Sequence, residues 1–254
     1  MMKATFLGTG TSQGVPMIGC DCMVCISENS RDKRLRSSLM LEYNQRTVVI
    51  DTGPDFRQQM LRGNVKNLDA VLFTHEHKDH VAGLDDIRAF NYFHNKPIDL
   101  YLSSLVEKSL RREFAYIFEE EKYPGIPQVE LHIIKNEPFE LFGKIFTPVE
   151  VKHYKLPVFG YIVDSLAYIT DAKSIEKEEI KKLYGIKYLI INALRKQTHL
   201  SHLTLDEALE IIQIIRPEKA FLTHISHQLG RHDEIERQLP DNVKLGFDGL
   251  VLNL

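Results

Sequence analysis

The segment at residues 74–80 constrains this sequence most, because it places three imidazoles and the carboxylate of Asp79 within six positions, 75 to 80. It directly follows the apolar run at residues 70–73, which predicts a buried strand. Beyond that strand the chain enters a tight turn, where alternate side chains can face one metal ion and the remaining two a neighbouring ion. The spacing therefore predicts a dinuclear metal site at the end of the strand.

The composition is that of a globular chain with a large core. Of its 254 residues, 43% are hydrophobic and 26% are charged, so we expect residues 1–254 to form a single domain. We find no signal sequence and no run of membrane-spanning length. The formal net charge is −3 with both signs interspersed, which offers no broad positive field for nucleic acid. These features favour a cytoplasmic protein and count weakly against RNA or DNA as its partner.

All three cysteines lie in one cluster, Cys20, Cys22 and Cys25. Their odd number leaves a thiol over in any disulfide scheme, and the C-x-C-x-x-C spacing is denser than the alternative, three small core side chains, would require. Thiolates are preferred ligands of zinc, and a structural zinc site needs four ligands. The cluster therefore predicts a zinc-binding loop at about residues 8–27, completed by one of the eleven histidines.

Apolar runs bounded by turn residues alternate with helix-like segments. Strands are predicted at residues 5–7, 38–43, 47–50, 70–73, 98–102, 130–134, 145–151, 160–163, 166–169, 188–191, 219–222 and 250–252. Helices are predicted at 55–61, 80–90, 105–118, 175–183, 205–215 and 232–239. Two of them open with capping boxes, Ser104 with Glu107 and Thr204 with Glu207. Hairpin turns and strand–helix–strand steps together predict a layered α/β sandwich.

Further potential ligands stand where predicted strands end. His153, Asp171 and His224 each follow an apolar run. Any one of these histidines alone would be interpreted as an ordinary core or surface imidazole. Their recurrence at strand ends instead favours histidines for each of two ions and one carboxylate that can bridge them.

Two other features have simpler interpretations. The glycine-rich loop at residues 8–14 either presents backbone N–H groups to a phosphate or is a tight turn. The charged run at residues 119–122 is interpreted as the solvated end of a helix.

The string His75–His80 reads H-x-H-x-D-H, which resembles the signature of the metallo-β-lactamase fold hydrolases. The resemblance covers nearly the whole chain and implies a four-layer αββα sandwich. Asp51, His153, Asp171 and His224 fall in order in the remaining metal-site motifs of that family. The resemblance implies the following ligands: His75, His77 and His153 for one ion, Asp79, His80 and His224 for the other, and Asp171 between them.

Longer strings resemble one subgroup, the phosphoribosyl 1,2-cyclic phosphate phosphodiesterases of phosphonate breakdown. These strings are residues 8–16, 19–25, 222–228 and 246–249. The resemblance implies that His227 completes the cysteine zinc site and that His202 is a catalytic histidine. It also implies manganese or zinc in the active site and a homodimer. An imidazole that titrates near pH 7 suits protonation of a leaving alkoxide, but the residues alone do not separate His202 from His199.

The resulting hypothesis is a metal-dependent phosphodiesterase in which two divalent ions activate water for attack on a small cyclic phosphodiester. Asp79 is expected to be indispensable to that step, and Asp51 to orient ligands or water without binding an ion itself. The same fold also hosts other hydrolases, so a ribonuclease Z-like RNA endonuclease and a lactonase are the alternatives. The complete donor set argues against a non-enzymatic scaffold.

Overall fold

The computed structural model describes residues 1–121 and 123–254, so Lys122, the last residue of the charged run at 119–122, lies outside the described residues. The first sheet contains β1 (Lys3–Gly8), β2 (Ser38–Tyr43), β3 (Arg46–Ile50), β4 (Ala70–Leu72), β5 (Ile98–Leu102), β6 (Val129–Ile133) and β15 (Val251–Asn253). The second sheet contains β7 (Phe139–Leu141), β8 (Lys144–His153), β9 (Leu156–Val163), β10 (Leu166–Ile169), β11 (Ser174–Ile175), β12 (Tyr188–Asn192), β13 (Lys219–Thr223) and β14 (Val243–Leu245).

The helices are α1 (Phe56–Arg62), α2 (Lys78–Val81), α3 (Arg88–His94), α4 (Ser104–Glu113), α5 (Ala115–Phe118), α6 (Lys177–Lys182), α7 (Leu205–Ile215) and α8 (His232–Glu236). Two short 3-10 turns, η1 (Ser30–Asp32) and η2 (Leu84–Ile87), complete the assigned helical elements.

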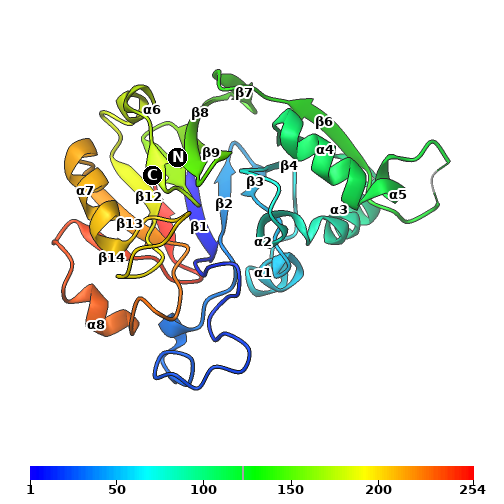
Figure 1. The fold of residues 1–254 in the computed structure, drawn as a ribbon. Helices are drawn as coiled ribbons and strands as arrows, with labels where there is room; N and C mark the ends of the chain where they lie inside the picture. Colours follow the sequence, from blue (N-terminus) through cyan, green and yellow to red (C-terminus); the bar gives the residue numbers. More distant parts are fainter. Residues whose placement is uncertain (122) are drawn as a thin grey trace.

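Two mixed sheets pack face to face between two layers of helices (Figure 1). The first sheet has the order β15-β1-β2-β3-β4-β5-β6, and its strands β3 to β6 run parallel. The second has the order β11-β8-β9-β10-β12-β13-β14, in which β10, β12, β13 and β14 run parallel. Helices α1 to α5 lie beside the first sheet and α6 to α8 beside the second (Figure 1). The molecule is therefore the predicted αββα sandwich.

Three buried apolar clusters correspond to the three interfaces between these layers. Along β3, Val48 and Ile50 face the second sheet, whereas Val49 packs under the helices of the first layer. This alternation follows from the two-residue period of a strand. Because both faces are covered, strands such as β3 are apolar throughout, which is why they were recognisable in the sequence.

The predicted helix at residues 80–90 is wrong as a single element. The structure divides this segment into α2, η2 and α3, and α3 continues to His94. The interruption lies at Gly83, where an added Cβ would sit 2.1 Å from the carbonyl oxygen of Gly53. Close packing of two backbone segments therefore overrides the local helical pattern.

Other boundaries also differ from the prediction. The helix at residues 105–118 is two helices, and its N-cap is Ser103, whose hydroxyl accepts from the Val106 N–H, so the Ser104–Glu107 capping box is wrong. The Thr204–Glu207 capping box is confirmed. The short strands β7, β11 and β14 were missed because two or three residues carry too little periodicity to be recognised.

The described part of the charged run, residues 119–121, is a solvated helix end, as expected. Helix α5 ends at Phe118, and residues 119–121 are exposed. Across the described ranges 1–121 and 123–254, none of the helices has the length and apolar character needed to cross a lipid bilayer.

We predict that Gly53→Ala disturbs the segment that carries Asp79. A Cβ at position 53 would lie 2.1 Å from the Asp79 carbonyl oxygen, so backbone must move, at a cost of about 1–3 kcal/mol or more. Thermal unfolding and metal content of the purified variant measure the effect. Gly63→Ala is the control, because its nearest neighbour is the Val65 side chain at 3.1 Å. Equal behaviour of the two variants would contradict this explanation.

Candidate metal centre

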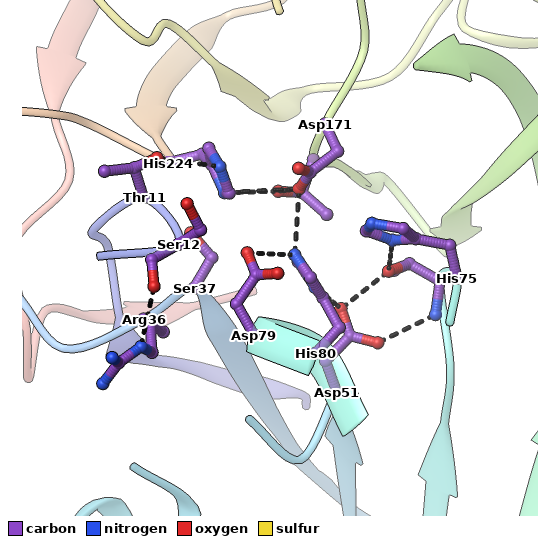
Figure 2. A network of polar contacts seen from close by, with 12 residues as sticks. Thr11, Ser12, Arg36, Ser37, Asp51, His75, Asp79, His80, Asp171 and His224 are labelled. Carbon is purple, nitrogen blue, oxygen red and sulfur yellow. Dashed lines mark hydrogen bonds and ion pairs between the residues drawn. The ribbon is translucent and has the colours of Figure 1, made fainter. Parts of the chain in front are cut away.

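The predicted donors meet where parallel strands of both sheets end. Asp51 follows β3, His75 lies just beyond β4, Asp171 lies just beyond β10 and His224 follows β13. Parallel strands place their carboxyl ends at one edge of a sheet, and here the two edges face each other across the sandwich. Figure 2 shows these side chains pointing toward one another from separate elements.

Three of these residues share an uncommon backbone conformation. Asp51, Asp171 and His224 have φ angles of 65°, 56° and 53°, in the left-handed region that non-glycine residues seldom occupy. Each stands at or near the point where its strand gives way to a turn. Such strain persists where surrounding contacts over-determine it and is concentrated at functional sites.

The first donor group is formed by three histidines. The ring centroids of His75 and His77 lie 4.6 Å apart, and those of His77 and His153 lie 5.0 Å apart. His153 Nδ1 lies within hydrogen-bonding distance of the carbonyl oxygens of Asp171, at 3.0 Å, and Ser201, at 2.8 Å. A ring held in this way by Nδ1–H leaves Nε2 free to bind a cation.

His75 is oriented by a short chain of hydrogen bonds. The Thr74 hydroxyl donates to Asp51 Oδ2 at 2.8 Å, so its oxygen can accept from His75 Nδ1 at 3.0 Å. His75 Nε2 is buried and has no hydrogen-bond partner among the described residues. An unpartnered buried nitrogen is costly unless a ligand uses it.

The second donor group surrounds the Asp171 carboxylate. Oδ2 of Asp171 lies 3.2 Å from His80 Nε2 and 3.2 Å from His224 Nδ1, while Asp79 Oδ2 lies 3.2 Å from the same His80 nitrogen. Ligand atoms of these four residues all lie within 4.8 Å of one another. Asp171 also groups with His153 and His202 within that distance, so its carboxylate lies between the two donor groups.

Asp51 lies behind these donors. Its Oδ2 is 2.7 Å from His80 Nδ1, and its Oδ1 accepts the backbone N–H of Thr74 at 2.8 Å. The carboxylate is fully buried and belongs to neither group. It therefore fixes the rings of His80 and, through Thr74, of His75.

The charges in this site depend strongly on one another. Burial alone would lower the pKa of His80, but Asp79 and Asp171 hold that pKa well above its usual value. Burial raises the pKa of Asp51 despite its contact with His80. Burial would likewise raise the pKa of Asp171, yet His224 and His80 keep it well below its usual range. The buried carboxylates thus require positive charge between them.

A divalent cation fits this arrangement. The donors are imidazole nitrogens and carboxylate oxygens, which suit zinc, manganese or iron. His75 Nε2 is buried without a hydrogen-bond partner in the part of the chain that the structure describes, and His80 Nε2 faces the carboxylates of Asp79 and Asp171 at 3.2 Å. A cation between the rings and carboxylates would satisfy these atoms and replace the charge that His80 otherwise carries.

His202 and His199 occupy different positions. The His202 ring is buried, 4.5 Å from the His153 ring and 4.8 Å from the His224 ring, and its Nδ1 lies 3.7 Å from Asp171 Oδ1. His199 is partly exposed, and its Nδ1 contacts Ser201 at 3.3 Å. Burial, reinforced by His224, lowers the pKa of His202 to about 3. His202 therefore faces the donor groups, and His199 lies behind it.

The three cysteines converge on the predicted histidine. Nδ1 of His227 lies 3.3 Å from both Cys20 Sγ and Cys22 Sγ, and Cys25 completes a four-member group. Burial opposes ionisation of Cys22, but the Cys25 N–H and His227 lower its pKa to about 6. A thiolate at neutral pH is the form that binds zinc.

Three N–H groups of the glycine-rich loop are already paired with backbone carbonyls and are therefore not available to a phosphate. The N–H groups of Gly10, Thr11 and Gly14 donate to carbonyl oxygens of Leu35, Ile225 and Thr11, at 2.8, 3.1 and 2.7 Å.

The threonines that precede donors were missed in the sequence. Thr74 and Thr170 contact His75 and Asp171, and the repeated Thr-His and Thr-Asp pairs were the available signal.

The fold and these donors define a metal-dependent hydrolase. A family model described as "Beta-lactamase superfamily domain" matches residues 46–225, so the chain belongs to that superfamily, as its H-x-H-x-D-H string predicted. The chain is 42% identical to a solved structure described as a new diphosphatase from the PhnP family. That match has a TM-score of 0.94 and covers 100% of this chain and 98% of the other.

Two curated relatives have names other than diphosphatase. An octanoyltransferase of Porphyromonas gingivalis is 40% identical over 252 residues, which are 98% of this chain and 51% of that protein. A ribonuclease Z of Prochlorococcus marinus is 29% identical over 173 residues, covering 64% of this chain and 49% of that protein. The chain thus spans about half the length of these relatives.

We predict that Cys22→Ser weakens zinc binding at the cysteine group and lowers the melting temperature by about 5–10 °C, equivalent to ~2–3 kcal/mol. The reason is the loss of one thiolate from a loop with little apolar core. Elemental analysis and thermal unfolding measure both effects. Met23→Ser, at an exposed position of the same loop, is the control. Unchanged metal content in Cys22→Ser would rule out the cysteine site.

Proposed function

We propose that this chain hydrolyses small phosphodiesters, such as phosphoribosyl 1,2-cyclic phosphate, with two divalent ions of manganese or zinc in its active site. The observation that carries the proposal is the position of the Asp171 carboxylate between two groups of imidazoles, with His202 close by. Phosphoryl transfer needs charge neutralisation and positioning more than covalent chemistry, and this site is built for both.

The residues would divide the work as follows. One ion would be held by His75, His77 and His153, the other by Asp79, His80 and His224, and Asp171 would contact both. When bound, such ions stabilise the charge that develops on phosphoryl oxygens and make a water molecule a stronger nucleophile at neutral pH. Asp51 keeps His80 in place through its 2.7 Å contact with Nδ1.

His202 is proposed to protonate the leaving oxygen. Its Nδ1 faces Asp171 Oδ1 at 3.7 Å and has no hydrogen-bond partner among the described residues, so the nitrogen is available to a substrate. Burial and the neighbouring His224 lower the pKa of His202 to about 3, and Asp171 opposes that shift. The negative charge of a bound phosphodiester would raise this pKa toward neutrality, which would allow the ring to carry a proton when it is needed.

A second candidate is hydrolysis of a phosphoanhydride bond. It is favoured by the 42% identity to the structure described as a diphosphatase. An RNA substrate, suggested by the ribonuclease Z match, is less favoured because the net charge of −3 provides no positive field for a polyanion. A lactonase would make less use of a site that can neutralise several phosphoryl oxygens.

We further propose that residues 1–254 act as one hydrolase domain with a zinc-binding loop at about 8–27, completed by His227. The contacts of His227 with Cys20 and Cys22 support a structural role for its zinc.

A hydrolysis panel on metal-reconstituted protein tests the substrate class. We expect turnover of bis(p-nitrophenyl) phosphate and faster turnover of phosphoribosyl 1,2-cyclic phosphate. A dinucleoside diphosphate, a precursor tRNA and an acyl lactone serve as competing substrates. Preference for the diphosphate would select the second candidate, and inertness toward all phosphorus esters with full metal content would refute both.

We predict that Asp79→Ala and His202→Ala fail for different reasons. Asp79→Ala should lose bound metal together with activity, because it removes a donor beside His80. His202→Ala should keep its metal while kcat falls by about 10²–10⁴-fold and the alkaline decline of the pH profile disappears. His199→Ala is the matched control and should change kcat little. Normal turnover by His202→Ala would overturn the assignment of the acid.

A further inference from the structure

The second donor group and the cysteine group are joined by one short segment of backbone. His224 belongs to the second donor group and His227 to the cysteine group. Between them, the Ile225 N–H donates to the Thr9 carbonyl at 2.8 Å, and the Thr11 N–H donates to the Ile225 carbonyl at 3.1 Å. Two backbone hydrogen bonds, one in each direction, therefore join the zinc-binding loop to the segment at residues 224–227. They form a β-bridge between Gly10 and Ile225, which is called the bridge below.

The Thr11 side chain reaches from this bridge to the donor group. Its hydroxyl lies 3.3 Å from His224 Nε2, and the threonine is buried (Figure 2). The opposite nitrogen, Nδ1, lies 3.2 Å from Asp171 Oδ2. The nearby Thr170 hydroxyl donates to Asp171 at 2.6 Å, so its proton is not directed at His224.

We propose that Thr11 is a positioning residue for His224 and that it couples the two metal sites. By accepting from His224 Nε2–H, Thr11 selects the tautomer whose Nδ1 lone pair faces Asp171 and the second ion. The inference rests on the metal site of the proposed function, but not on the identity of the substrate.

Backbone hydrogen bonds hold Gly10 and Thr11, and the cysteine group would add to this order because the rest of the loop has little apolar core. Its buried apolar cluster contains only Val15, Val24 and Cys25, with Met17 and two further cysteines against it. Ile18, Met23 and Ile26 are largely exposed. A cluster of this size cannot offset the entropy of ordering the loop, so a bound zinc would supply the missing constraint.

Thr11 lies between the cysteines and His224, so a change at the cysteine group would reach His224 through it. Beyond Thr11, the loop is anchored again where the Val15 and Arg34 backbones exchange hydrogen bonds of 2.9 and 2.7 Å. The cysteines follow directly, and His227 returns the connection to the 224–227 segment. Release of zinc would loosen both ends of the bridge and let the His224 ring rotate, which would weaken binding of the second ion.

Thr11→Val tests the positioning role, because valine keeps the shape and removes the acceptor. We expect the affinity for the more weakly held catalytic ion, measured by chelator competition, to fall by about 10–100-fold while zinc at the cysteines is retained. Histidine ¹⁵N spectra should show that one ring loses its single tautomer. Thr11→Ser should restore both properties, and Ser12→Ala, an exposed hydroxyl in the same loop, should change neither. Wild-type ion affinity in Thr11→Val would overturn the proposal.

The coupling is tested with Cys22→Ser, alone and combined with Thr11→Val. We expect Cys22→Ser to weaken the second ion in the wild-type background but to add little in the Thr11→Val background, because both act through His224. Fully additive losses, or an unchanged affinity in Cys22→Ser, would refute coupling through Thr11. Since the readout is ion affinity, a protein inert toward phosphodiesters could still support this inference while the proposed function failed.

Discussion

Three carboxylates around one buried imidazole, two of them buried as well, set the conditions for the rest of this site. Asp51, Asp79 and Asp171 all lie close to His80, and their combined charge holds the His80 pKa well above its usual value. Burying such charges without compensation would destabilise the fold, so the site requires positive charge. A divalent cation supplies that charge and also provides chemistry. Stability of the centre and its reactivity therefore have the same electrostatic origin.

The fold serves this requirement by bringing strand ends together. Loops at the carboxyl ends of parallel strands in both sheets carry the donors, and Asp51, Asp171 and His224 turn the chain there with positive φ angles. Rigid strands limit the positions of these side chains, while the interrupted segment from α2 to α3 packs against the chain at Thr52 and brings His80 to Asp51. The break at Gly83, which local periodicity did not predict, is thus part of how the site is assembled.

The segment at residues 224–227 links this centre to the cysteine group. His224 and His227 point to different donor groups although they are three positions apart, and the bridge to Thr9 and Thr11 lies between them. The N-terminal loop therefore contacts the metal centre directly. It supplies a hydroxyl next to a metal donor, and we propose that its own order depends on the cysteines that it carries.

Local sequence patterns were enough to predict a metal-dependent hydrolase: H-x-H-x-D-H after an apolar run, donors at strand ends and a cysteine cluster. These signals are local or follow strand periodicity, so they survive without coordinates, and they gave the family and the sandwich. Tertiary structure decided what depends on distant segments meeting. It brought His202 rather than His199 to the donors, put Asp51 behind His80 and set Thr11 against His224. Those contacts join residues up to 213 positions apart, and no local pattern specifies them.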